Sequence, residues 1–141
     1  MDPITIHNGF LTVTNQSTGE HRTFRVRTQQ DDAKFAPGER IVSLLIGPDN
    51  TSDYQGFGFV KDNGWIILWK RNRTSQYEGL AKALRLASRA LERGEDTFTT
   101  PRATYSVQLS KRCLRCNKVL SHPNSLEKGY GPECAQSLNL A

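Results

Sequence analysis

The three cysteines of this 141-residue chain all lie between residues 113 and 134, and their spacing constrains the fold of the C-terminal part more than any other feature. Cys113 and Cys116 are separated by two residues, which lets a tight turn direct two thiolates at one tetrahedral ion. Cys134 follows a Gly-x-Gly-Pro turn and begins a short apolar run. His122 is the nearest suitable fourth donor, in the order C-x2-C-x5-H-x11-C. We therefore expect a structural zinc site.

The sequence alone does not determine the fourth ligand of this site. His7, His21 or a carboxylate from elsewhere in the chain can also close a site of three thiolates. Three is an odd number for a disulfide framework, and no signal peptide follows Met1, so we do not expect disulfides. If neither His122 nor another side chain is the fourth ligand, the metal keeps an open position for water, which is the one route to hydrolytic chemistry in this sequence.

The same segment resembles a short zinc-finger-like domain of unknown function that recurs in bacteriophage and actinobacterial proteins. Its pattern is close to C-x-x-C-x-x-x-L-[ST]-x-P-x-S-x-x-x-G-x-G-P-x-C. The matching positions are Cys113, Cys116, Leu120, Ser121, Pro123, Ser125, Gly129, Gly131, Pro132 and Cys134. The family often has an acidic residue at the position of His122. The resemblance implies metal binding and a phage or bacterial origin, and it implies no known reaction.

The first half of the chain has the pattern of a mainly antiparallel sheet. Two alternating segments flank a turn-rich stretch at residues 15–19, which predicts a hairpin. A short apolar run stopped by Gly47 and Pro48 predicts a buried strand. Asn63-Gly64 is the preferred two-residue hairpin turn. The five predicted strands cover residues 10–14, 23–27, 41–46, 57–60 and 65–70.

One strong helix is predicted over residues 75–93, with Gly94 as its C-terminal stop. Its apolar stripe is formed by Leu80, Leu84, Ala87 and Leu91. Residues 95–110 are polar and contain Pro101, which predicts a linker with one strand at residues 105–109. The expected fold is α+β: a sheet-and-helix domain at residues 1–94, this linker, and a zinc-finger module at residues 111–141.

Positive charge is concentrated in the second half of the chain. Residues 1–70 carry 7 Lys and Arg against 8 Asp and Glu, whereas residues 71–141 carry 12 against 6. Such asymmetry favours an anionic partner, most plausibly nucleic acid. We expect a stripe of cations opposite the apolar face of the helix, although a solvated helix face is the alternative. The candidate phosphate-binding residues are Arg71, Arg73, Lys82, Arg85, Arg89, Arg93, Lys111, Arg112, Arg115 and Lys118.

Residues 55–62 match the middle of the RNP1 octamer of RNA-recognition domains. The match fails at both ends, at Gln55 and Asp62, and the expected element order is wrong for such a domain. We expect the aromatic residues here to lie mainly in the core. Phe57, Phe59 and Trp69 stay candidates for base stacking, with Phe57 and Phe59 on the same strand face.

No catalytic motif is present. The sequence contains no Gly-rich phosphate loop, no H-E-x-x-H, no nucleophile elbow and no zinc-deaminase signature, so we do not expect an enzyme. No apolar run is long enough to span a bilayer, and the cytoplasm is the expected location. The first functional hypothesis is a small zinc-binding accessory protein that binds nucleic acid through the basic helix and finger. The second is a phage counter-defence protein that inhibits a host protein or captures a nucleotide signal.

Overall fold

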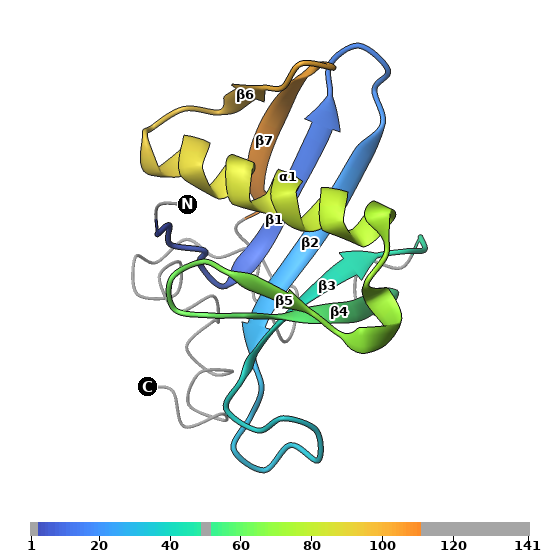
Figure 1. Ribbon diagram of the computed structural model, residues 1–141, viewed down its shortest axis with the longest axis vertical. Coiled ribbons are helices and arrows are strands. Elements are labelled where there is room, and N and C mark those ends of the chain that lie inside the picture. Colours follow the sequence, from blue (N-terminus) through green and yellow to red (C-terminus); the bar gives the residue numbers. More distant parts are fainter. Residues whose placement is uncertain (1–2, 49–51, 111–141) are drawn as a thin grey trace.

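The computed structural model describes residues 3–48 and 52–110, which form an antiparallel sheet with an α-helix against one face (Figure 1). The seven strands follow the order β5-β4-β3-β2-β1-β7-β6. Helix α1 (Ser75–Glu92) and the short 3-10 helix η1 (Lys70–Asn72) connect β5 to β6. The strands are β1 (Gly9–Asn15), β2 (His21–Thr28), β3 (Arg40–Leu45), β4 (Tyr54–Val60), β5 (Ile66–Leu68), β6 (Thr97–Thr99) and β7 (Thr104–Ser110).

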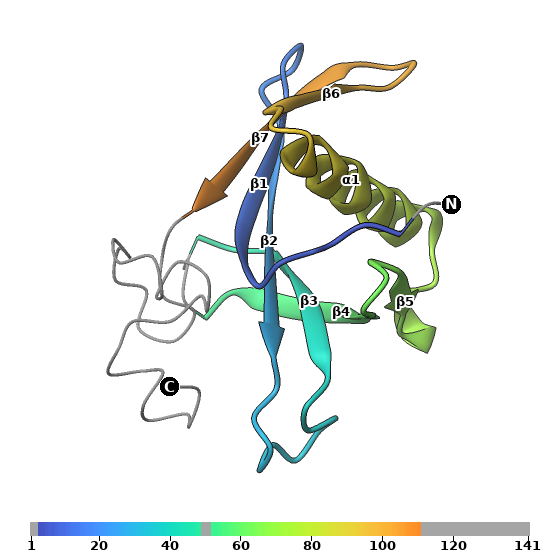
Figure 2. The same cartoon turned by 90° about the vertical axis from the view of Figure 1, so that its left-hand side faces the viewer.

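The main core lies between α1 and the sheet face that it crosses, which we call the inner face. Alternate residues of β1, β2 and β3 point to this face, as the period of a strand requires. Leu84 and Ala87 of α1 are buried against them, and so are Ile4 and Ile6 of the N-terminal segment. Figure 2 shows this segment on the same side of the sheet as α1. We call the opposite face of the sheet the outer face.

The predicted helix is confirmed, since α1 begins and ends where the local signals indicate. The hydroxyl of Thr74 caps the first turn by accepting from the backbone N–H of Tyr77 at 3.3 Å. Gly94 follows the helix with φ +72°, the left-handed conformation that favours glycine at this position. The predicted apolar stripe faces the core, with Leu84 and Ala87 buried and Leu80 and Leu91 partly buried.

The turn between β4 and β5 differs from the prediction of a two-residue Asn-Gly turn. The N–H of Gly64 donates to the carbonyl of Lys61 at 2.9 Å, and the N–H of Lys61 donates to the carbonyl of Trp65 at 2.8 Å. Gly64 has a positive φ of +83° and Asn63 does not, so the loop has three residues and ends in a left-handed glycine. The backbone of Ile4 packs directly on Gly64, which leaves no room for a side chain there.

The predicted fold class was wrong in its division into a five-stranded sheet, a linker and a separate module. Residues 95–110 contain β6 and β7, and β7 pairs with β1 inside a seven-stranded sheet. The strand predicted at residues 105–109 is confirmed as part of β7, in which Tyr105, Val107 and Leu109 alternate with polar residues. The prediction missed β6, and Pro101 lies in the β6–β7 turn rather than in a strand. The zinc-finger module was assigned to residues 111–141, which lie outside the described residues.

Candidate nucleic-acid interface

An irregularity in β4 separates the two phenylalanines that were expected to share a strand face. The register between β3 and β4 shifts at Val42/Ser43, so that Phe57 is an extra residue between the paired positions of Gly56 and Gly58. Phe57 therefore points to the inner face, where it is fully buried and contacts Phe24 at 6.4 Å between ring centroids. This burial excludes Phe57 from base stacking, whereas Phe59 lies on the outer face.

Three aromatic side chains meet on the outer face near β4, and we call them the aromatic cluster: Phe35, Phe59 and Trp69. The rings of Phe35 and Phe59 are stacked at 6.1 Å with an interplanar angle of 15°. Trp69 meets both of them edge-on, at 5.3 Å from Phe35 and 5.7 Å from Phe59. Phe35 is 53% exposed, and Phe59 and Trp69 are half-buried. The cluster thus offers aromatic surface to solvent.

The loop that carries Phe35 is held in shape by its own hydrogen bonds. The backbone N–H of Gln29 donates to the carbonyl of Glu39 at 2.8 Å, which closes the base of the loop between β2 and β3. The side-chain amide of Gln29 donates to the carbonyl of Phe35 at 3.1 Å. Ala36, the next residue, has φ +47°, a conformation that residues other than glycine seldom adopt. The exposed ring is therefore fixed at its position rather than left on an open loop.

Glycine at position 56 makes room for the indole ring of Trp69 on the outer face. A side chain added at Gly56 would place its Cβ only 2.7 Å from Cη2 of Trp69 and 3.3 Å from Cγ2 of Ile41. The glycines of the RNP1-like segment thus have a packing role that does not depend on RNA. The indole N–H of Trp69 is buried and has no acceptor in the described part of the chain.

Two cations lie over rings of the aromatic cluster. The ammonium nitrogen of Lys61 is 5.5 Å from the centroid of Phe59, and the guanidinium of Arg71 is 5.5 Å from the centroid of the Trp69 ring. Lys61 also forms an ion pair with Glu39 at 3.3 Å. Arg71 lies in η1, directly after Trp69, and its side chain is exposed. Exposed aromatic surface beside cations is the combination that single-stranded nucleic acid requires.

The predicted stripe of four outward cations on α1 is only partly formed. Lys82 and Arg93 are exposed, and Arg89 is half-buried. Arg85 is only 8% exposed; its guanidinium donates to the carbonyl of Gly64 and lies 4.7 Å from the ring centroid of Trp65. Burial lowers the pKa of Arg85, and the charge of Arg89 lowers it further. Arg85 thus joins α1 to the β4–β5 turn and does not face solvent.

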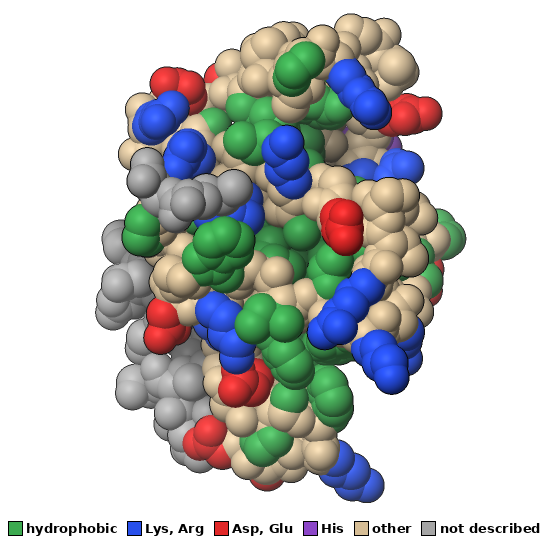
Figure 3. Space-filling view, in the orientation of Figure 1, with side chains coloured by type: hydrophobic (Ala, Val, Ile, Leu, Met, Phe, Trp, Pro, Cys, Tyr) green, Lys and Arg blue, Asp and Glu red, His purple; other side chains and the backbone are tan. Residues whose placement is uncertain are grey.

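The surface on the α1 side is mixed rather than uniformly basic. Figure 3 shows Lys and Arg side chains spread over this face, with carboxylates and exposed hydrophobic side chains between them. Arg73 is exposed just before α1, close in sequence to Arg71. The remaining basic candidates, Lys111, Arg112, Arg115 and Lys118, lie outside the described residues. In the described part of the chain, the cations that lie over rings of the aromatic cluster are Lys61 and Arg71.

Sequence reasoning missed Phe35 and Lys61 as members of the site. Phe35 lies in a loop with no hydrophobic periodicity, and its only signal was an isolated aromatic residue beside Lys34. Lys61 lies within the RNP1-like segment, but a single lysine before a turn is common. Both residues reach the cluster through the pairing of β2, β3 and β4, which a local pattern does not reveal.

The predicted metal ligands Cys113, Cys116, Cys134 and His122 all lie outside the described residues. His7 and His21, the alternative fourth donors, are exposed. Within residues 3–48 and 52–110, no three His, Cys, Asp or Glu side chains gather into a group that could hold a metal ion.

The comparisons with known proteins bear mainly on the C-terminal part. Residues 104–139 match a family of unknown function, DUF6011. The match begins at the first residue of β7, so it includes a strand of the sheet. No curated protein and no solved structure matches the chain. Of the helices in the described part, none has the length and apolar character needed to cross a membrane.

Proposed function

We propose that the protein binds single-stranded nucleic acid on its outer sheet face, through the aromatic cluster and the cations beside it. The observation that carries this proposal is the stacked Phe35–Phe59 pair, with Phe35 53% exposed and Lys61 over the ring of Phe59. An exposed ring on a fixed loop loses little conformational freedom on binding. Unpaired bases would stack on these rings, which a duplex cannot do because its base faces are already covered.

The expected contributions to the binding free energy are large enough to measure. Base–aromatic stacking contributes about 1–3 kcal/mol per base in known single-strand binders. Lys61 and Arg71 would contact the backbone between stacked bases, and each neutralised phosphate lowers the slope of log K against log salt by about 0.7 for a single strand. Lys82 and Arg93 on α1 are exposed and add long-range attraction, whereas the buried Arg85 has no part in the proposal.

We extend the proposal to zinc, held by Cys113, Cys116, Cys134 and a fourth donor for which His122 is the first candidate. Support comes from the donor chemistry alone, since three thiolates and an imidazole form a set that zinc prefers. Zinc would have a structural role there, because it would link distant parts of the segment, and it would not catalyse a reaction. A cytoplasmic location and a phage or bacterial origin belong to the same proposal. DUF6011, a family of unknown function, adds no reaction to it.

The test is fluorescence polarisation with labelled single-stranded DNA, RNA and duplex DNA of equal length, at low and moderate salt, with protein freed of nucleic acid. We expect single strands to bind at least tenfold more tightly than duplex. Phe35→Ala should weaken binding about fivefold or more, the lower end of the stacking range.

The matched control is Ile46→Ala, which removes an apolar side chain that is 61% exposed at the other end of β3. Its affinity should equal that of the wild type. Equal losses in both variants would show that the effect is not specific to the aromatic cluster. Absence of binding to every nucleic acid at low salt would refute the proposal and favour the second hypothesis, a counter-defence protein that binds a host protein or a nucleotide.

A further inference from the structure

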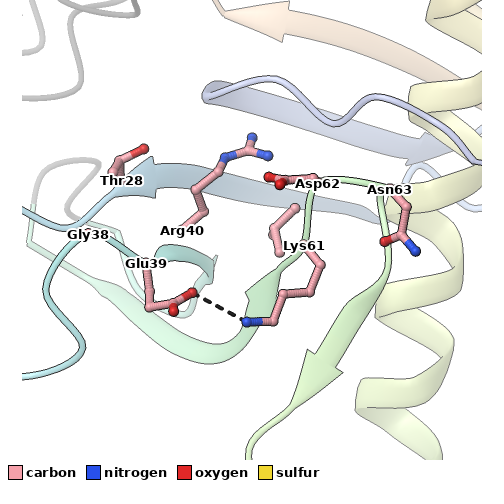
Figure 4. Close-up of a pocket in the computed structure, with 8 residues that line it drawn as sticks. Thr28, Gly38, Glu39, Arg40, Lys61, Asp62 and Asn63 are labelled. Carbon is pink, nitrogen blue, oxygen red and sulfur yellow. Dashed lines mark hydrogen bonds and ion pairs between the residues drawn. The ribbon is translucent and has the colours of Figure 1, made fainter.

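A polar pocket opens beside the aromatic cluster, at the end of the sheet where β2, β3 and β4 meet the turn before β5. Its volume is about 700 Å³, which is ample for one nucleobase with its sugar. The polar side chains that line it belong to Thr28, Glu39, Arg40, Lys61, Asp62 and Asn63. Figure 4 shows Arg40 and Asp62 on one side of the pocket and the Glu39–Lys61 ion pair on the other.

The charges around this pocket balance, because two of the lining residues are basic and two are acidic. Arg40 is held by neutral acceptors: its Nε donates to Oδ1 of Asn8 at 3.1 Å and its Nη2 to the carbonyl of Ile6. Burial lowers the pKa of Arg40, and attraction to Asp62 opposes that shift. A pocket with balanced charges favours a neutral ligand that is rich in donors and acceptors over a simple anion.

Lys61 connects this pocket to the aromatic cluster. Its side chain lines the pocket, and its ammonium nitrogen lies 5.5 Å from the ring centroid of Phe59. A strand whose bases stack on the cluster would therefore have its next nucleotide at the entrance of the pocket. A base in the pocket would meet the carboxylate of Asp62 and the guanidinium of Arg40, which both line it.

We propose that the pocket takes one unstacked guanine of the bound strand, with its N1–H and 2-amino groups donating to the Asp62 carboxylate and O6 accepting from Arg40. Among the four bases, guanine alone presents two adjacent donors beside an acceptor on its Watson–Crick edge. Adenine and cytosine offer one donor group, and thymine offers a single N–H between two carbonyls. This inference rests on the proposed single-strand binding and adds base preference to it.

The experiment compares a twelve-residue oligo(dT) with the same oligonucleotide that carries one central guanine, by fluorescence polarisation with the full chain. We expect the guanine to raise affinity about 5- to 100-fold, the range for a bidentate base contact. Asp62→Asn removes the carboxylate without a change of shape. It should abolish this preference, so that the two oligonucleotides bind with equal affinity. Inosine in place of guanine lacks the 2-amino group and should lose most of the gain.

The possible results separate the two proposals. Binding of oligo(dT) with no preference for guanine overturns the pocket assignment and leaves the stacking site in place. A guanine preference that survives in Asp62→Asn also overturns it. If neither oligonucleotide binds, the proposed function fails and the pocket assignment fails with it. A preference lost in Asp62→Asn and reduced by inosine supports the assignment.

Discussion

Gly56→Ala offers a quantitative test of the aromatic cluster, because it inserts one methyl group beneath Trp69. The new Cβ would lie 2.7 Å and 3.1 Å from two carbons of the indole ring and 3.3 Å from Cγ2 of Ile41. Carbon atoms pack at about 3.5–4.0 Å, so the ring must withdraw by about 1 Å. Overpacking of this kind costs about 1–3 kcal/mol. We expect the free energy of unfolding to fall by about 1–2 kcal/mol, with displacement of Trp69.

Urea unfolding followed by circular dichroism measures this loss, and the emission maximum of Trp69 in a Trp65→Phe background reports the displacement. Gly79→Ala is the matched control, because a Cβ at this exposed position of α1 meets no atom within 4 Å. It should raise the free energy of unfolding by about 0.5–1 kcal/mol, since alanine favours a helix over glycine. If Gly56→Ala is as stable as the wild type and keeps its emission spectrum, Trp69 does not lie against β4 and the described arrangement of the aromatic cluster is wrong.

Three further changes test other parts of the account. Arg85→Leu should lower the free energy of unfolding by about 1–3 kcal/mol in urea titrations, because the carbonyl of Gly64 loses a buried donor. Its affinity for oligonucleotides should stay unchanged. A large loss of affinity without a loss of stability would contradict this structural role. Burial raises the pKa of Tyr54 above its ordinary value of 10.0, so the unfolded state releases the phenolic proton first as pH rises. Stability should therefore fall above about pH 10, and less steeply in Tyr54→Phe; identical pH profiles would refute this cause. Elemental analysis of protein purified without chelator should give one zinc per chain, and less in Cys113→Ser; zinc-free wild-type protein would exclude the metal site.

Local sequence patterns were sufficient to predict the elements that are determined by residues close together in the sequence. The apolar spacing of α1 and Gly94 predicted its bounds to within a residue. The first hairpin and β3 also followed from alternation and turn residues. In each case, the residues that determine the structure are close neighbours in sequence.

The features that the prediction missed depend on partners far apart in the chain. The bulge that turns Phe57 inward arises from the register of β4 against Ser43 in β3. The strand at β7 was predicted, but its place in the main sheet was not, because it pairs with β1, about a hundred residues earlier. Arg85 had the spacing of a surface cation, but its side chain reaches the carbonyl of Gly64 in a separate turn.

The aromatic candidates also divide into residues that local sequence identified and one that depends on distant contacts. Phe59 and Trp69 were identified from their place on strands with exposed aromatic faces. Phe35 was not identified, because its position depends on how the loop between β2 and β3 folds back onto β4. Sequence alone therefore named two of the three clustered rings, and the tertiary structure was needed to show that Phe35 joins them.

The most direct measurement is the emission of Trp69 during titration with oligo(dT), in a Trp65→Phe background that leaves Trp69 as the single tryptophan. Bases that stack on the aromatic cluster should quench this emission saturably, with a midpoint that matches the dissociation constant from polarisation. Phe35→Ala in the same background should shift both midpoints together. Tight binding of oligo(dT) with no change in Trp69 emission would contradict the account and place the nucleic acid elsewhere on the protein.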